Sequence, residues 1–370
     1  MTPPRPSGAS LDTDVSESSA PETRDNTNKM TQTPASDLLA ARVYEKTGIP
    51  TEFLDPDAVK ILHRLRRKGF DAYLVGGCVR DILLKRQPKD FDIATSARPR
   101  QIKQLFRNCR IIGRRFKLAH LHFDGKIIEV STFRRRPEMD EDSDDLLITS
   151  DNAFGTSEED AERRDFTCNG LFYDPEEDCI HDFVDGVNDI EKKLVRTIGD
   201  PPTRIQEDPV RILRAIKFAA RLNLRIGKQT WKAICSNVGD LQKAASPRIL
   251  EEILRLLRTG KALRGFQLMR ECGALEVLLP EIHDFLDDAD RDTQMRFWRL
   301  LEALDAYLLQ YRLQEGNDIR PQPSTPVILG SFFQAFVENA RQVDSARGGR
   351  RAGSDTDRGG AIAGLIGPHL

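Results

Sequence analysis

The chain has 370 residues, of which 39% are apolar and 31% are charged, and its formal net charge is −2. This length supports two or three domains with a sizeable buried core. No run approaches the about 18 consecutive apolar residues of a transmembrane helix, and the opening MTPPRPSGAS has no signal-peptide-like segment. Six cysteines without a C-x-x-C pair argue against a zinc ribbon or a disulfide scaffold. We therefore expect a cytoplasmic protein that contacts no membrane.

The balanced net charge hides an uneven distribution along the chain. Residues 98–136 contain twelve Lys and Arg against two acids, whereas residues 138–165 contain twelve acids against two Arg. A near-neutral protein of this kind can still present a basic face to a polyanion.

The first half of the chain predicts an α/β domain behind a disordered tail. Residues 1–36 are rich in Ser, Thr, Pro and Asp and are predicted to be disordered. Apolar periodicity and turn signals predict helices over 38–48, 57–68, 78–85 and 99–108, and strands over 72–75, 90–95, 118–123 and 127–133. Asp124-Gly125 predicts a hairpin turn. The acidic stretch 137–160 is expected to be a mobile loop.

The second half reads as a series of amphipathic helices. They are predicted over 208–224, 246–260, 261–273, 291–313 and 326–343. Asp208 and Ser246 are predicted N-caps, each followed by a proline in the first turn. The predicted organisation is a disordered tail over 1–36, a head domain with a small mixed sheet over 37–195, a helical neck over 196–280, a helical body over 281–345 and a disordered Gly/Arg-rich tail over 346–370. The fold class is therefore α+β.

The first candidate site is the sequence GGCVRD at 76–81 followed by DFD at 90–92. Gly76 and Gly77 come between a buried strand and a helix, where glycine lets a backbone approach a phosphate closely, and Arg80 lies within reach of the same phosphate. Asp90 and Asp92 alternate along a strand, so both carboxylates point to one face and repel each other unless a cation lies between them. Such oxygen ligands suit Mg²⁺ carrying a nucleoside triphosphate. The competing interpretation is a glycine turn and two surface aspartates without a bound ligand. It is weaker because the glycine turn and the aspartate pair occur close together in the sequence.

Two further groups are less specific. Glu129 shares a strand face with Ile127 and Ser131, and either a metal-facing role or a plain exposed position explains it. Arg164, Asp165 and Asn169 suit a ribose or a phosphate, but an ordinary salt-bridged turn explains them at least as well.

The last group lies at 207–217. Arg211, Arg214 and Lys217 are spaced three apart on a predicted helix and form one basic stripe, which is also typical of a solvated face.

These motifs together carry a resemblance. G-G-x-x-R-D with D-x-D, then R-R-D-F-T-x-N, then E-D-P-V-R-x-x-R-A are similar, in this order, to the bacterial tRNA CCA-adding enzyme and poly(A) polymerase family of polymerase-β-like nucleotidyltransferases. The similarity covers roughly residues 60–280 of the chain. The stretch LFRNCRIIGRRFKLAHLHF at 105–123 resembles the polyadenylating branch in particular.

The resemblance implies an adenylyltransferase that adds AMP from ATP to RNA 3′ ends without a template and releases pyrophosphate. Two Mg²⁺ ions would be held by Asp90 and Asp92. Glu129 or Asp165 would be the third catalytic carboxylate, although orienting a ribose or an arginine is an equally good role for Asp165. The implied nucleotide-binding residues are Gly76, Gly77, Arg80, Arg164, Asn169, Asp208, Arg211, Arg214 and Lys217.

Base reading by a carboxylate and a guanidinium has a simple donor and acceptor logic. In the implied site Asp208 accepts from the adenine amine and Arg211 donates to the neighbouring ring nitrogen. Uracil and guanine present the opposite pattern, while cytosine shares that of adenine, so this pair does not choose ATP over CTP.

The alternatives are a CCA-adding tRNA nucleotidyltransferase and, less favoured, a non-catalytic RNA-binding protein on the same scaffold. A P-loop NTPase is excluded because no G-x-x-x-x-G-K-[ST] occurs. The expected partner is single-stranded RNA, bound by a monomeric protein through the basic stretch, with Arg114, Arg115, Arg134, Arg135 and Arg136 as candidates.

Overall fold

The computed structural model describes residues 41–113, 117–136, 153–313, 323–334 and 337. Some predicted features fall outside these residues, namely the tails over 1–36 and 346–370, the end of the helical body, most of the loop over 137–160, and Arg114 and Arg115. No helix in the described part of the chain is long and apolar enough to span a bilayer.

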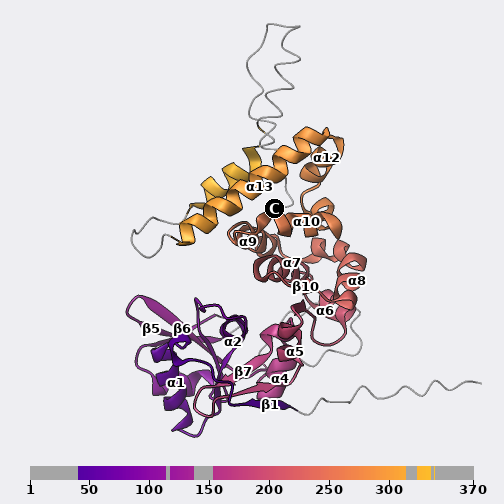
Figure 1. Ribbon diagram of the computed structural model, residues 1–370. Helices are drawn as coiled ribbons and strands as arrows, with labels where there is room; N and C mark the ends of the chain where they lie inside the picture. The colour runs from indigo at the N-terminus through magenta and orange to yellow at the C-terminus, as the bar shows by residue number, and fades with distance from the viewer. Residues whose placement is uncertain (1–40, 114–116, 137–152, 314–322, 335–336, 338–370) are drawn as a thin grey trace, which may run out of the picture. The chain divides into compact units, whose positions relative to one another are not determined.

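Within the described residues, one mixed sheet of eight strands forms the head (Figure 1). The strand order is β1-β8-β7-β2-β3-β6-β5-β4, and neighbouring strands are antiparallel except β3 and β6, which are parallel. The strands are β1 (Arg42–Glu45), β2 (Ala72–Val75), β3 (Asp92–Thr95), β4 (Cys109–Ile112), β5 (Leu118–Phe123), β6 (Lys126–Thr132), β7 (Leu171–Asp174) and β8 (Cys179–Asp182). The predicted fold class, a mixed-sheet head followed by helices, is confirmed, but the sheet is larger than the four predicted strands.

The helix predicted over 38–48 is wrong in its described part. Residues 42–45 form β1, which pairs with β8 from Arg42 opposite Asp182 to Glu45 opposite Cys179. Only Tyr44 of this strand is partly buried, so the segment lacks the continuous apolar stripe that a helix would bury. The edge of β8 instead offers backbone hydrogen-bonding groups, and tertiary pairing overrides the local preference.

Strands β7 and β8 are absent from the prediction because they do not alternate. All four residues of β7 are buried, and so are three of the four in β8. A strand buried on both faces has no period of two to detect.

The two faces of the sheet have different environments. Leu74 and Ile93 belong to the main core beside the helices, whereas Val75 and Ala94 belong to a smaller cluster on the other face. Asp92 is two residues from Ala94 and therefore shares the second face. The head helices are α1 (Pro56–Arg66), α2 (Gly77–Leu83), α3 (Pro99–Leu105), α4 (Ser157–Glu162) and α5 (Gly186–Glu191). Helix α4 occupies part of the stretch predicted to be a mobile loop.

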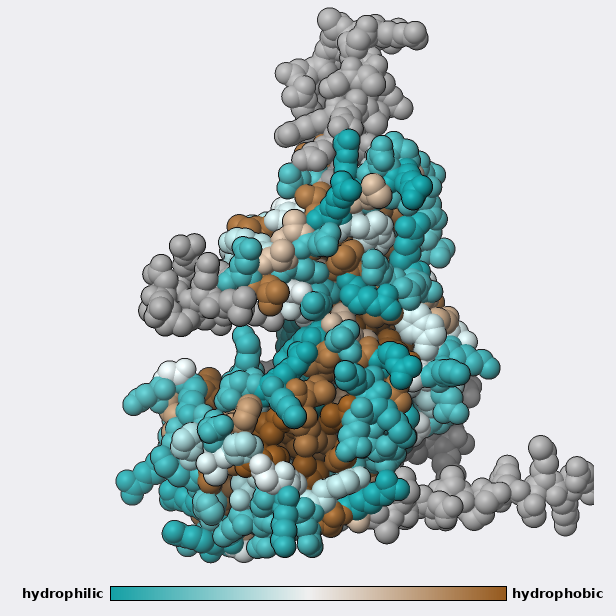
Figure 2. All heavy atoms as spheres, viewed as in Figure 1, coloured by the Kyte–Doolittle hydropathy of each residue, from teal (hydrophilic) through white to brown (hydrophobic). Residues whose placement is uncertain are grey.

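Helices make up nearly all of the rest of the described chain (Figure 1). They are α6 (Pro201–Glu207), α7 (Arg211–Leu222), α8 (Lys228–Ser236), α9 (Ser246–Leu257), α10 (Ala262–Glu271), α11 (Ala274–Leu278), α12 (Pro280–Asp288), α13 (Arg291–Leu313) and a helix over 325–334. The exception is β10 (Arg225–Ile226), which pairs in parallel with β9 (Leu194–Val195). In Figure 2 hydrophilic residues cover most of the face in view, and hydrophobic residues come to the surface over the head.

The predicted caps of two of these helices are wrong. Val210 is the N-cap of α7, and Asp208 is the C-cap of α6. Ala245 is the N-cap of α9, with Ser246 as its first residue. The side chain of Asp208 is thereby available for a different role.

Candidate active site

A polar hollow of about 760 Å³ collects residues from the head and from the helical region. We call it the central hollow. All predicted catalytic and nucleotide-binding residues line it: Gly76, Gly77, Arg80, Asp90, Asp92, Glu129, Arg164, Asp165, Asn169, Asp208, Arg211, Arg214 and Lys217. The structure thus brings together motifs that are distant in sequence. The ion pair between Arg221 and Asp81, which are 140 residues apart, fastens the helical region to the head beside this hollow.

The turn between β2 and α2 requires glycine. Gly76 has φ +72° and ψ −123°, which L side chains rarely adopt. A Cβ there would also lie 3.1 Å from Nη1 of Arg164. Any side chain at this position would therefore strain the backbone and displace an arginine that lines the hollow.

Three carboxylates lie next to one another on the sheet. Asp92 begins β3 and is the Cα partner of Glu129 on β6, while Asp90 comes just before the strand. Burial and the charge of Glu129, with a smaller contribution from Asp90, raise the pKa of Asp92 to about 6 although Arg164 opposes the shift. Crowded oxygen donors whose charges disfavour one another fit a divalent cation.

Asn169 connects two of the predicted nucleotide-binding arginines. Its Oδ1 accepts from Nη1 of Arg80 at 2.6 Å, and its backbone oxygen accepts from Nη1 of Arg164 at 3.3 Å. Its amide nitrogen donates to Oδ1 of Asp165 at 2.9 Å. These contacts use both ends of the amide, so Asn169 orients its neighbours in the hollow.

Both oxygens of Asp165 are engaged by the protein. Oδ2 accepts from Nε and Nη2 of Arg214 at 2.7 and 2.6 Å, and Oδ1 accepts from Asn169 and from the backbone nitrogen of Phe166. Burial alone would raise the pKa of Asp165, but the Arg214 charge and these hydrogen bonds lower it to about 2. The geometry is that of an arginine-orienting carboxylate.

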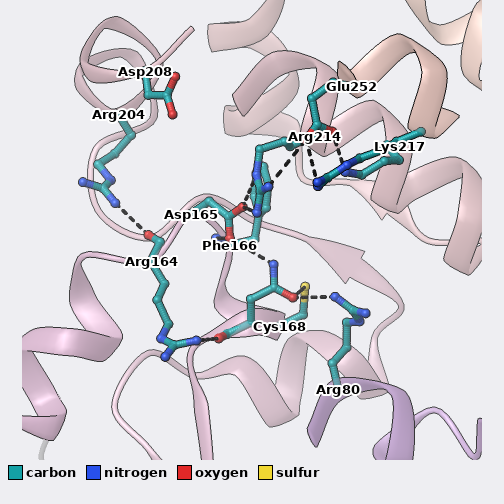
Figure 3. Close-up of polar contacts among 12 residues, drawn as sticks. Arg80, Arg164, Asp165, Phe166, Cys168, Arg204, Asp208, Arg214, Lys217 and Glu252 are labelled. Atoms are coloured by element: carbon teal, nitrogen blue, oxygen red, sulfur yellow. Dashed lines mark hydrogen bonds and ion pairs between the residues drawn. The ribbon is translucent and has the colours of Figure 1, made fainter. Parts of the chain in front are cut away.

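The basic stripe on α7 is not a solvated face. Arg211 and Lys217 are buried, and Lys217 forms an ion pair with Glu252 of α9. Arg214 lies between Asp165 and Glu252, with Nη1 3.7 Å from Oε1 of the glutamate (Figure 3).

Sequence reasoning missed Glu252, although a signal was present. It is in phase with the buried Ile249, Ile253 and Leu256 of α9, so it is an acid within an apolar stripe. A buried acid needs a cationic partner, and that requirement points to the arginines and lysine of a neighbouring helix.

Asp208 and Arg211 lie at the helical wall of the central hollow. Oδ2 of Asp208 accepts from Nη2 of Arg248 at 2.8 Å, whereas its Oδ1 is buried and has no hydrogen-bond partner among the described residues. Nη1 of Arg211 donates to Glu207 at 2.9 Å and to the backbone oxygen of Arg204. The carboxylate therefore offers an acceptor beside an anchored guanidinium.

The three described arginines of the predicted RNA-binding set differ in environment. Arg134 is only 5% exposed and lines the central hollow, so it belongs to the interior and not to an open basic face. Arg135 is half-buried and Arg136 is exposed, with Nη2 3.1 Å from the backbone oxygen of Glu162. Of these three, only Arg136 has the exposed position that the basic stretch suggested.

A second group with metal-ligand side chains lies on the β7–β8 hairpin. The possible ligand atoms of Asp174, Cys179 and His181 all lie within 4.8 Å of one another. Asp174 is already paired with Arg66 and accepts two backbone hydrogen bonds. Because its carboxylate is satisfied by the protein, we assign no site there.

Comparison with known proteins gives two family matches. A model described as "Poly A polymerase head domain" matches residues 72–196, and one described as "Probable RNA and SrmB- binding site of polymerase A" matches residues 223–286. Poly(A) polymerase I of Salmonella typhi is 38% identical over 312 residues, which cover 82% of this chain and 65% of that protein. The chain thus spans less than two thirds of the length of this relative.

CCA-adding enzymes are also similar to the chain. The enzyme of Pediococcus pentosaceus is 38% identical over 227 residues, which cover 59% of this chain and 54% of that protein. The crystal structure of the Bacillus stearothermophilus CCA-adding enzyme in complex with CTP superposes with a TM-score of 0.54 at 27% identity, covering 80% of this chain and 78% of that one. The chain belongs to the nucleotidyltransferase family that comprises the bacterial poly(A) polymerases and the CCA-adding enzymes.

Proposed function

We propose that the protein is a template-independent polynucleotide adenylyltransferase that transfers AMP from ATP to RNA 3′ ends and releases pyrophosphate. The observation that carries this proposal is the composition of the central hollow. A cluster of carboxylates lines it, and so do Asp208 and Arg211, a hydrogen-bond acceptor and a donor that could together contact the edge of a base. Poly(A) polymerase I of Salmonella typhi is similar over 82% of this chain and that of Haemophilus influenzae over 73%, whereas the CCA-adding enzyme of Pediococcus pentosaceus is similar over 59%, which favours adenylation over other nucleotidyl transfers. We further propose a monomer acting in the cytoplasm and the division into head (37–195), neck (196–280) and body (281–345).

Asp90 and Asp92 would hold two Mg²⁺ ions, with Glu129 as the third carboxylate. Bound Mg²⁺ would activate the RNA 3′ hydroxyl and neutralise the triphosphate and the leaving pyrophosphate. Glu129 suits this role better than Asp165, because its side chain is 47% exposed at the cluster whereas Asp165 is occupied by Arg214.

The head positions the triphosphate through its glycine turn and its arginines. Gly76 and Gly77 let the backbone lie close to the guanidinium groups of Arg164 and Arg80. Arg164 is held by Asp160 at 2.9 Å, which fixes its guanidinium at the edge of the hollow. Preorganised charge of this kind loses little energy to reorganisation during transfer.

The helical wall would read the base. The unpartnered Oδ1 of Asp208 accepts from the adenine amine, and Arg211 donates to the adjacent ring nitrogen. Uracil and guanine would leave both groups unpaired. Cytosine satisfies the same pair, so CCA addition is the second candidate, favoured by the similarity to the CTP-bound CCA-adding enzyme.

The product ladder on a short RNA separates these functions. The protein should be incubated with Mg²⁺ and each nucleoside triphosphate in turn, with a generic RNA and with a tRNA that lacks its CCA end. An adenylyltransferase gives a long ladder with ATP alone on the generic RNA. Addition of CTP followed by a single ATP, on the tRNA only, would identify a CCA-adding enzyme. No incorporation on either RNA would identify a non-catalytic protein.

A further inference from the structure

A second cavity, of about 840 Å³, adjoins the carboxylates from the other side. It lies against the β5–β6 hairpin, and we call it the hairpin hollow. It shares four lining residues with the central hollow, which are Lys89, Asp90, Asp92 and Glu129. The carboxylate cluster is therefore the boundary between two cavities, each in the size range of small-molecule sites.

We propose that the hairpin hollow receives the 3′-terminal nucleotide of the acceptor RNA. This inference rests on the proposed function. In an in-line phosphoryl transfer the attacking hydroxyl and the leaving pyrophosphate lie on opposite sides of the reacting phosphorus, with the metal site beside both. If the triphosphate occupies the central hollow, then the hydroxyl arrives from the other side of Asp90 and Asp92, where the hairpin hollow opens.

The wall of this hollow has the chemistry of a nucleoside site. In the antiparallel β5–β6 pair, His120 is the partner of Glu129 and His122 is the partner of Ile127, so these four side chains share one face. Ile127 is 48% exposed, and with the two imidazole rings it offers an apolar surface on which a base or a ribose can pack.

His122 adds an unused polar atom. Its Nε2 is buried without a hydrogen-bond partner among the described residues. The backbone of His122 is fixed by Asn108, which accepts from its nitrogen at 3.1 Å and donates to its oxygen at 2.8 Å. The ring is thus held on a rigid strand at the wall of the hollow, with one nitrogen whose hydrogen-bonding capacity is unsatisfied among the described residues.

The same face continues onto β4 and gives the RNA a path away from the site. Arg110 is the partner of His120, and Ile112 is the partner of Leu118, so both lie on the face of the hollow. Arg110 is exposed and Ile112 is 46% exposed. An upstream phosphate can meet Arg110, whereas Lys126 is already engaged by Asp55 and Asp57.

Steady-state kinetics of two variants test the proposal. Ile127→Glu places a negative charge on the acceptor wall, and His122→Ala removes the unused nitrogen. We expect each to raise the KM for a short RNA about tenfold while the KM for ATP stays unchanged. Val43→Glu is the matched control, because Val43 is also 48% exposed but lies on β1 at the opposite edge of the sheet. It should leave both KM values at their wild-type level, and a thermal melt of each variant checks folding.

Cross-linking provides a readout that does not need turnover. RNA with 4-thiouridine as its 3′-terminal nucleotide should cross-link to the peptide that contains residues 118–132. A cross-link confined to residues 208–217, or an unchanged RNA KM in both variants of a normally active enzyme, would overturn the acceptor site and leave the proposed function intact. A wild-type protein that extends no RNA but still gives the expected cross-link would contradict the proposed function instead.

Discussion

Replacing Asp165 with asparagine separates a metal-binding from an arginine-orienting role. The side chain is 11% exposed, and its two oxygens accept hydrogen bonds from Arg214, Asn169 and the backbone of Phe166. An asparagine at this position would retain only one acceptor oxygen. Its amide nitrogen would face a donor on one side, so at least one buried hydrogen bond is broken whichever way the amide turns.

The magnitude follows from the pKa of Asp165. The native pKa is about 2 and the ordinary value is 3.8, a difference of nearly two pH units that corresponds to about 2 kcal/mol. Because the folded-state pKa is the lower one, this stabilisation is fully present above pH 3.8 and is lost as the pH falls towards 2. Asp165→Asn should therefore lower the free energy of unfolding by about 2 kcal/mol at neutral pH. The gap to the wild type should close below about pH 4.

Two assays distinguish the roles. Urea unfolding across the pH range gives the stability difference, and initial rates of RNA extension against Mg²⁺ concentration give the metal dependence. We expect Asp165→Asn to lower kcat without a change in the Mg²⁺ concentration at half-maximal rate. Glu129→Gln, at a 47% exposed position, should raise that concentration and leave stability nearly unchanged. An equal rise for Asp165→Asn would refute the arginine-orienting role and make Asp165 a metal ligand.

Other residues of the site give further expectations. Asp92→Ala should abolish nucleotide addition in the ladder assay. Asp92→Asn should raise the melting temperature in chelator above pH 6, because burial and neighbouring carboxylates raise the pKa of Asp92 to about 6 and thus disfavour its charged form. Asp208→Asn should relax discrimination against UTP and GTP with little change in melting temperature. Arg211→Lys should impair the use of ATP more than it weakens RNA affinity. Extension assays with each of the four nucleoside triphosphates can show both effects. Arg136→Ala should reduce the salt slope of RNA binding by about 0.7 for each RNA phosphate that the arginine neutralises, whereas Arg134→Ala should lower the melting temperature, because Arg134 is 5% exposed.

The residues that line the central hollow could be predicted because they carry local signals. The glycine pair at 76–77 interrupts an apolar strand, and Asp90 and Asp92 share a strand face whatever the surroundings. Glu129 is a weaker signal, because a plain exposed position explains it nearly as well, and the structure places it opposite Asp92. Short-range periodicity is enough for such features.

The electrostatic partners could not be predicted, because they are contacts between distant segments. Lys217 and Glu252 are 35 residues apart, and Asp165 and Arg214 are 49 apart. From spacing alone, three cations on one helix face are as consistent with a solvent-exposed face as with a binding site. Asp208 illustrates the same limit, since its position before a proline and a helix predicted a cap while the chain uses it to end α6.

The ion pairs also bear on how ATP could be distinguished from CTP when adenine and cytosine share a hydrogen-bonding pattern. Arg214 joins Asp165 of the head to Glu252 of the helical region, and Arg211 on the same helix is anchored by Glu207. The helical wall that we propose reads the base is thereby tied to the head, which limits how far Asp208 can move relative to Asp90 and Asp92. A purine presents its amine and ring nitrogen farther from the ribose than a pyrimidine does. If Asp208 and Arg211 are held at a fixed distance from the head, they can hydrogen-bond either the purine or the pyrimidine, but not both. Selectivity for ATP or CTP would then follow from the rigidity of the site and not from an additional hydrogen bond.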